Sequence, residues 1–220
     1  MAKIYWAGQS CFQISVSTSK DHSADIVIDP FSDEKTGLKL PNLSADILLV
    51  THEHTDHNNI KDVKGSPFII QGPGEYEVKE VFVQGIPSFH DDKEGKERGQ
   101  NTIYVIEAED LRFCHLGDLG QKLLTDEQLE KIDKVDVLMI PVGGEFTIDS
   151  SAAQKIIGQV EPKIVIPMHY SLPKLKMKLD EVSKFLKTMG KPSVVPQEKL
   201  VIKASALSKE AAMEIVVLQP

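Results

Sequence analysis

A cluster of histidines is the feature of the sequence best suited to chemistry. Three of the seven histidines lie in the hexapeptide HEHTDH at residues 52–57, directly after an apolar run. Imidazole nitrogens are the commonest ligands of zinc and similar ions, and a loop at a strand end can aim alternate side chains at one point. We therefore expect His52 and His54 to face one ion, and Asp56 and His57 to face a second. The alternative is a polar surface loop that is rich in histidine by chance.

Further motifs along the chain extend this pattern. They are VIDPF at 27–31, SFHDD at 88–92, CHLGDLG at 114–120 and IPMHY at 166–170. With HEHTDH as a His-x-His-x-Asp-His signature, they follow the order found in the metallo-β-lactamase superfamily, over roughly residues 3–170. The chain resembles this superfamily, and within it the compact branch of zinc-dependent hydrolases related to ascorbate-6-phosphate lactonase.

The resemblance implies seven ligands for two divalent ions. His52, His54 and His90 would hold one ion, Asp56, His57 and His169 the other, and Asp118 would bridge them. Zinc is favoured, and manganese or iron also suits such donors. The implied activity is hydrolysis of a small anionic ester, lactone or phosphoester by a hydroxide shared between the ions. Asp118 would position this hydroxide, and Asp56 would assist proton transfer.

His90 and His115 compete for the third position on the first ion. If residues 112–116 form a strand, simple alternation points His115 and Asp118 to opposite sides. His90 lies beyond the end of a predicted strand at 81–86 and can reach the site freely. We therefore assign His90 to the ion and interpret His115 as a core residue or a support for the ligands.

Four other residues are candidates for supporting roles. Asp29 could accept the outer N–H of a ligating histidine, or could simply form an Asp-Pro turn. Arg98, in the charged loop 91–101, could clamp an anionic group of the substrate, although such loops are solvated by default. Tyr170 and Phe146 could line the pocket or could be packing residues.

One position departs from the pattern of the branch. Its members often carry a histidine after the first glycine, where this chain has Gln9 in WAGQSCF. If that histidine supports the site or the substrate, the replacement puts substrate specificity in doubt more than metal binding.

The elements that must position these side chains are short strands followed by alternating strands and helices. Strands are predicted at 3–6, 11–16, 25–28, 46–51, 67–71, 78–86, 102–107, 111–116, 135–142, 163–168, 200–206 and 212–218, with a turn at 72–76. Helices are predicted at 125–132, with a Thr125/Gln128 capping box, and at 150–160 and 179–189. With the resemblance, this order predicts an α/β fold, an αββα sandwich of two mixed sheets with helices on the outer faces.

Composition narrows the class of protein. A chain of 220 residues is typical of one domain, which we expect to cover 1–220. The net charge of −8 disfavours nucleic acid as a partner.

The expected location is the cytoplasm. We see no leader peptide and no apolar window long enough to span a bilayer, and we expect a protein that acts on a small molecule without a membrane partner. Cys11 and Cys114 should be buried, reduced thiols. Oligomeric state stays open.

Three rival functions share this fold. A nuclease would need an inserted domain, and only about fifty residues separate Asp118 from His169. A di-iron redox protein would carry a glutamate in place of His54 and an attached flavin domain. A member that binds metal or ligand without turnover is the main alternative, although a cage with an open position for water is a catalytic arrangement.

Overall fold

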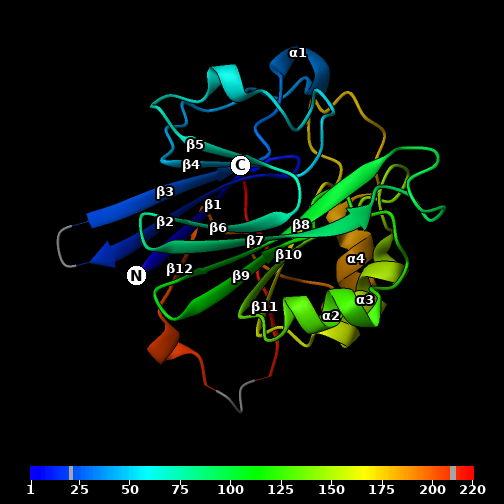
Figure 1. Ribbon diagram of the computed structural model, residues 1–220. Helices are drawn as coiled ribbons and strands as arrows, with labels where there is room; N and C mark the ends of the chain where they lie inside the picture. The colour runs from blue at the N-terminus through cyan, green and yellow to red at the C-terminus, as the bar shows by residue number, and fades with distance from the viewer. Residues whose placement is uncertain (20–21, 209–211) are drawn as a thin grey trace.

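Two mixed β-sheets packed face to face form the centre of the protein (Figure 1). The computed structural model describes residues 1–19, 22–208 and 212–220. Within these residues, one sheet has the strand order β12-β1-β2-β3-β4-β5 and the other β13-β11-β10-β9-β8-β7-β6. The two sheets therefore each combine a meander with parallel strands, as predicted.

The first sheet is built mostly from the N-terminal third of the chain. Its strands are β1 (Ala2–Gly8), β2 (Cys11–Ser19), β3 (His22–Ile28), β4 (Ile47–Val50), β5 (Phe68–Gln71) and β12 (Leu200–Ile202). β1, β2 and β3 pair antiparallel, whereas β3, β4 and β5 pair parallel. All four residues of β4 are buried, which explains its unbroken apolar sequence.

The second sheet contains the rest of the strands. They are β6 (Gly74–Val78), β7 (Val81–Phe89), β8 (Gln100–Ala108), β9 (Leu111–His115), β10 (Val137–Pro141), β11 (Ile164–Met168) and β13 (Glu214–Ile215). β6 to β9 form an antiparallel meander, and β9, β10, β11 and β13 are parallel. Tyr104 on β8 ties this sheet to the first, because its hydroxyl donates to the carbonyl of Val50, 2.9 Å away.

Helices are few. They are α1 (Asp33–Thr36), α2 (Asp126–Ile132), α3 (Ser150–Val160) and α4 (Val182–Thr188), with short 3-10 turns at Ile60–Asp62 and Ala204–Ala206. The predicted capping box of Thr125 and Gln128 is present at the start of α2. α3 buries its apolar face in the main core, and α4 contacts α3. No helix among the described residues is both long and apolar enough to cross a bilayer.

Several predicted boundaries differ from the structure. The segment predicted as a turn at 72–76 contributes most of β6, which pairs with β7. The predicted strand 200–206 is split between β12 and a 3-10 turn, and the predicted strand 212–218 is reduced to β13 and an isolated bridge at Leu218. The predicted helix 179–189 begins only after its N-cap, Glu181.

The pairing directions explain how distant ligands are brought together. β1, β3 and β4 run in one direction, because β1 and β3 both pair antiparallel with β2 and β4 pairs parallel with β3. In the second sheet, β7, β9 and β11 likewise share one direction. Every predicted metal ligand lies in a segment that directly follows β4, β7, β9 or β11.

Candidate metal centre

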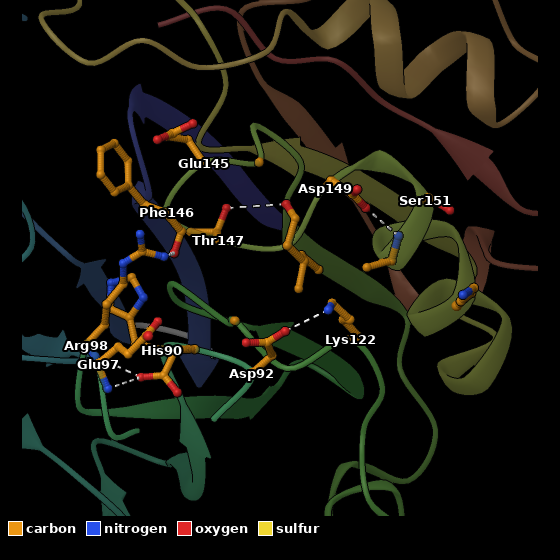
Figure 2. A pocket seen from close by; sticks show the side chains of 16 residues that line it. His90, Asp92, Glu97, Arg98, Lys122, Glu145, Phe146, Thr147, Asp149 and Ser151 are labelled. Atoms are coloured by element: carbon orange, nitrogen blue, oxygen red, sulfur yellow. Dashed lines mark hydrogen bonds and ion pairs between the residues drawn. The ribbon is translucent and has the colours of Figure 1, made fainter. Parts of the chain in front are cut away.

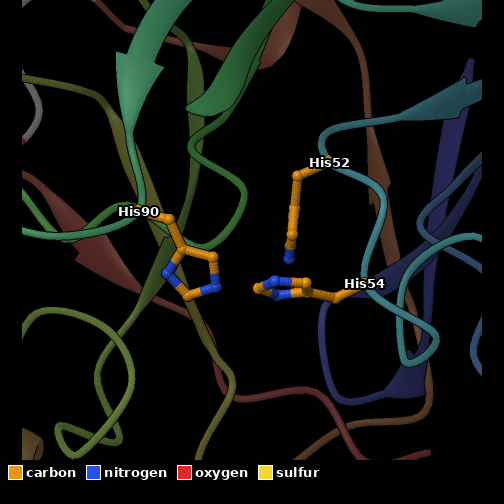
Figure 3. Close-up of side chains that lie close together, drawn as sticks. All are labelled: His52, His54 and His90. Atoms are coloured by element: carbon orange, nitrogen blue, oxygen red, sulfur yellow. The ribbon is translucent and has the colours of Figure 1, made fainter. Parts of the chain in front are cut away.

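Three histidines form one half of the site. His52 and His54 come from the loop after β4, and His90 follows the last residue of β7. One ring nitrogen of each lies within 4.8 Å of the other two. The rings face a common point (Figure 3), with centroids 4.6 Å apart for His52 and His54 and 4.7 Å for His52 and His90. Three imidazoles in this arrangement suit one divalent ion.

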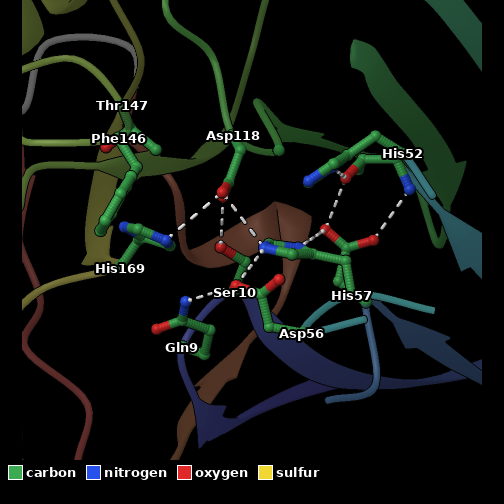
Figure 4. Close-up of polar contacts among 12 residues, drawn as sticks. Gln9, Ser10, His52, Asp56, His57, Asp118, Phe146, Thr147 and His169 are labelled. Atoms are coloured by element: carbon green, nitrogen blue, oxygen red, sulfur yellow. Dashed lines mark hydrogen bonds and ion pairs between the residues drawn. The ribbon is translucent and has the colours of Figure 1, made fainter. Parts of the chain in front are cut away.

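Asp118 lies between this trio and a second one, formed by Asp56, His57 and His169. Its Oδ2 atom is 3.1 Å from Nε2 of His57 and 3.3 Å from Nε2 of His169 (Figure 4). The same atom is 3.4 Å from Nε2 of His90. One carboxylate oxygen thus faces ligands of both trios. We call these seven side chains the cage: His52, His54, Asp56, His57, His90, Asp118 and His169.

Asp29 sets the orientation of two cage histidines. Its Oδ2 accepts hydrogen bonds from the hydroxyl of Thr51, at 2.7 Å, and from Nδ1 of His57, at 3.0 Å. The single hydroxyl hydrogen of Thr51 is thereby used, so its oxygen accepts from Nδ1 of His52, 3.0 Å away. Both rings therefore carry a proton on Nδ1 and turn Nε2 toward the cage.

The buried donors of the cage fit a metal ion. Nε2 of His52 and Nε2 of His57 are buried and have no well-aligned hydrogen-bond partner among the described residues. Burial, followed by the charge of His57, lowers the pKa of His52 to about 2, which keeps its ring neutral. Neutral imidazole nitrogens aimed at one buried point are the donors that zinc, manganese and iron use.

The electrostatics of the cage favour a bound cation. Burial opposes ionisation of Asp118, but His169 and His57 hold the pKa of its carboxyl well below the ordinary value. Burial likewise opposes a charge on His57, yet Asp118 and Asp29 hold its pKa well above the ordinary value. A buried place that stabilises a cation so strongly is suited to divalent ions.

Backbone strain is concentrated beside the cage. Gln9, Asp29 and His169 adopt the left-handed region, with φ of 54°, 49° and 51°. Such a conformation costs on the order of 1–3 kcal/mol for a residue other than glycine. Hydrogen bonds compensate: the amide of His169 donates to the carbonyl of Gln9 at 3.0 Å, and that of Asp29 to Leu49 at 3.0 Å. The strand ends are therefore bent to aim these side chains at the site.

Two residues that hold Asp118 were not predicted. Ser10 donates its hydroxyl to Oδ1 of Asp118 at 3.1 Å, and Oδ1 of Asn101 accepts from the amide of Asp118 at 3.0 Å. Ser10 lies in the turn between β1 and β2 and Asn101 lies on β8. No local pattern marks either residue, because both contacts span a large sequence separation.

His115 supports the same region without facing the cage. Its Nε2 donates to the carbonyl of Ser10 at 2.9 Å, and its Nδ1 accepts from the amide of Gly117 at 3.1 Å. Burial lowers its pKa, so the ring stays neutral, as these two bonds require. His115 therefore connects the turn that carries Ser10 with the turn that carries Asp118.

Gln9 contacts the cage from the other side. Its Nε2 donates to Oδ2 of Asp56 at 3.2 Å and lies 3.7 Å from the sulfur of Met177. The residue that departs from the pattern of the branch is therefore in direct contact with a predicted ligand. It offers a neutral amide at this position.

A cavity of about 260 Å³ opens above the cage. Besides cage residues, its wall contains Glu97, Arg98, Phe146 and Met177. Nη1 of Arg98 donates to the carbonyl of Phe146 at 3.2 Å, and the guanidinium lies 5.3 Å from the centroid of the Phe146 ring. A second cavity, of about 400 Å³, shares Arg98 and Phe146 and continues toward the start of α3 (Figure 2).

Tyr170 lies away from this cavity. Its hydroxyl donates to the carbonyl of Leu218 at 3.3 Å, and its ring is 4.9 Å from that of Trp6. The side chain is 4% exposed and belongs to the main core. Of the two aromatic candidates, only Phe146 lines the cavity.

The chain is similar to several known proteins. Residues 3–169 match the model of a family described as Beta-lactamase superfamily domain. A UPF0173 metal-dependent hydrolase of Pyrococcus furiosus is 30% identical over 200 residues, covering 78% of this chain and 85% of that protein. Another from Thermococcus onnurineus is 28% identical over 199 residues, with 78% and 85% covered. A Thermotoga maritima crystal structure, assigned to the zn-dependent hydrolases of the metallo-beta-lactamase superfamily, matches with a TM-score of 0.76 and 33% identity over 100% of both chains.

Proposed function

Since the chain belongs to the metallo-β-lactamase superfamily, we propose that it hydrolyses a small anionic ester, lactone or phosphoester with two divalent ions held in the cage. Its two mixed sheets and few helices match the α/β sandwich of that superfamily. The general class, a metal-dependent hydrolase, is that of its relatives. The number of ions and the class of substrate are the parts that we add.

The position of Asp118 is the observation that carries the proposal of two ions. Its Oδ2 lies within 3.1–3.4 Å of histidines from both trios, while its Oδ1 is held by Ser10. Each trio supplies three protein donors and Asp118 would be a shared fourth, so each ion would expand to five-coordinate to take up water or a substrate oxygen. Bound ions would supply Lewis acidity, which lowers the pKa of water to about 7 and polarises a substrate oxygen. Zinc is the ion that we favour, and manganese or iron would fit the same donors.

Asp56 is placed to move a proton. It lines the cavity, and its Oδ2 is held by the amide of Gln9 at 3.2 Å. Burial opposes ionisation of Asp56, but the hydrogen bond and charge of His57 keep its pKa below the ordinary value. The carboxylate is therefore ionised at neutral pH and can accept a hydrogen bond from water in the cavity. Its low pKa makes it a weak base, so we propose that it relays a proton and does not retain one.

The charges around the cavity favour an anionic substrate. Two divalent ions would outweigh the three nearby carboxylates of Asp29, Asp56 and Asp118. Arg98 adds a positive charge to the wall, and the charge of Glu97 is already balanced by Lys93, 2.5 Å away. A guanidinium matches a carboxylate or phosphate group in a bidentate way. The volume of about 260 Å³ limits the group bound next to the cage to a small one.

A substrate panel tests the proposal. Metal-loaded protein should hydrolyse at least one compound among lactones, phosphodiesters and thioesters, and anionic members should be preferred. Asp118→Ala should lower kcat/KM by at least about 10²-fold, because both trios lose their shared carboxylate. Asp126→Asn, an exposed change at the start of α2, is the matched control and should leave turnover unaltered. Failure of both the wild type and Asp118→Ala on every compound would favour a member that binds a ligand without turnover.

A further inference from the structure

Asp91 is the centre of the loop between β7 and β8. Its carboxylate accepts four backbone hydrogen bonds and is 4% exposed. Oδ1 accepts from the amides of Lys93 and Gly95, at 2.8 Å and 2.9 Å. Oδ2 accepts from the amides of Glu97 and Arg98, at 2.9 Å and 2.8 Å. One side chain therefore accepts from four backbone amides of a loop that has no helix or strand of its own.

The loop closes tightly around this carboxylate. The amide of Gly99 donates to the carbonyl of Gly95 at 3.0 Å, and the amide of His90 donates to that of Gly99 at 3.1 Å. A Cβ atom on Gly120 would lie 2.4 Å from the amide nitrogen of Asp91, so the base of the loop is packed against the turn after Asp118. A charged surface loop is mobile by default, whereas this one is fixed at its centre and at both ends.

The last of the four amides belongs to Arg98. Its guanidinium then lies over the ring of Phe146, donates to the Phe146 carbonyl at 3.2 Å and lines the cavity above the cage. Figure 2 shows Arg98 and Phe146 on facing loops at one side of the adjoining cavity. The backbone position of Arg98 depends on Asp91, and Asp91 directly follows the cage residue His90.

We propose that Asp91 is a positioning residue for substrate recognition: it holds the loop 91–99 so that Arg98 can pair with a carboxylate or phosphate group of a substrate at the cage. This inference rests on the proposed function, because the placement of Arg98 affects binding only when the ligand is anionic. A purely structural role would stabilise the loop without altering anion binding.

The test compares Asp91→Asn, Arg98→Gln and the double variant in the metal-loaded protein, with inorganic phosphate as the probe. Asparagine keeps the shape of the side chain but loses half of its acceptor capacity. Glu94→Gln is the matched control, since it removes a carboxylate from the same loop at a side chain that is 76% exposed and only pairs with Lys96. Metal content is measured for every variant, so that loss of the ions is recognised.

Two readouts are expected to change together. Hydrogen exchange at the amides of Lys93, Gly95, Glu97 and Arg98 should accelerate in Asp91→Asn but not in Glu94→Gln. The Kd for phosphate, from calorimetry, should rise by about 10-fold in both Asp91→Asn and Arg98→Gln, the effect of one lost charge-assisted contact. The double variant should bind phosphate no more weakly than Arg98→Gln alone, because Asp91 acts through Arg98.

The outcomes separate this inference from the proposed function. If Arg98→Gln weakens phosphate binding and Asp91→Asn does not, the positioning role is wrong while the anionic substrate stands. Additive losses in the double variant would also overturn the positioning role. If Arg98→Gln itself leaves the Kd for phosphate unchanged, Arg98 does not recognise the anion. The positioning role of Asp91 and the part that the proposed function gives to Arg98 are then both wrong.

If Asp91→Asn does not fold, Gly99→Ala replaces it as the test variant. This change strains the loop at a residue with φ of 90° and keeps the carboxylate of Asp91, and it should raise the Kd by the same 10-fold.

Discussion

Oδ2 of Asp29 lies 3.0 Å from Nδ1 of His57, in a fully buried contact at the base of the cage. The same oxygen is linked through the hydroxyl of Thr51 to Nδ1 of His52. One carboxylate therefore fixes the tautomer of one histidine from each side of the cage. Asp29 would therefore support metal binding without touching an ion, since a ring with its proton on Nε2 turns no lone pair toward the cage.

Replacing Asp29 with asparagine should weaken metal binding about 10–100-fold, the usual effect of removing a hydrogen-bond partner of a ligating histidine. The side-chain amide of the asparagine has an N–H₂ donor in place of one carboxylate oxygen, whereas the Thr51 hydroxyl and Nδ1 of His57 both need an acceptor. Competition with a chromophoric chelator measures the affinity, and Asp126→Asn is the control for loss of one carboxylate. An unchanged affinity in Asp29→Asn would show that the tautomers are set by other groups.

Gly117→Ala should destabilise the protein by about 2–4 kcal/mol, as the sum of a left-handed backbone and an overpacked contact. Gly117 has φ of 58°, and an added Cβ would lie 2.3 Å from Oδ1 of Asn101, the atom that holds the amide of Asp118. Gly158→Ala is the matched control, because this position in α3 has open space and should gain about 0.5–1 kcal/mol. Urea unfolding measures both, and equal effects would contradict the predicted packing.

The stability that Asp46 contributes should depend on pH. Nζ of Lys79 lies 2.5 Å from its Oδ1, and the amide of Asp25 donates to its Oδ2 at 3.0 Å. Burial opposes its charge, but these two partners hold the pKa of Asp46 below the ordinary value. The unfolded chain therefore binds the proton more tightly, so the contribution is complete above pH about 4 and is lost as the pH falls through the pKa of the folded state.

Urea unfolding of the wild type and Asp46→Asn at several pH values tests this dependence. The variant should be less stable at pH 7, by about 1 kcal/mol or less for a partly exposed pair, and the difference should shrink toward pH 3. Glu94→Gln, which alters an exposed carboxylate, should show no such trend. A difference of the same size at pH 3 and pH 7 would mean that the charge of Asp46 does not contribute.

The fold could be predicted because the patterns that indicate strands and helices involve residues that are close together in the sequence. Buried strands such as Ile47–Val50 are continuous apolar runs, and the capping box of Thr125 and Gln128 needs only four residues. The prediction of two mixed sheets in a metallo-β-lactamase sandwich is confirmed. β6 was missed because Gly72 and Pro73 before it and Gly74 at its start indicate a turn, and only its pairing with β7 makes it a strand.

The site could be predicted less completely. The resemblance of short motifs to the superfamily selected the seven cage residues, and they lie close together because they follow strands that end at one edge. The contacts of Ser10 and Asp91 depend on backbone shape in turns, which no spacing rule describes. Tyr170 was a candidate because it follows His169, but its side chain packs in the core and its hydroxyl donates to the carbonyl of Leu218.

Anomalous diffraction from crystals of the protein loaded with zinc is the most direct test of the central claim, that the cage holds two ions. Two peaks are expected about 3.5–4 Å apart, one among His52, His54 and His90 and the other among Asp56, His57 and His169, with the carboxylate of Asp118 between them. A single peak, or zinc bound only outside the cage, would contradict it.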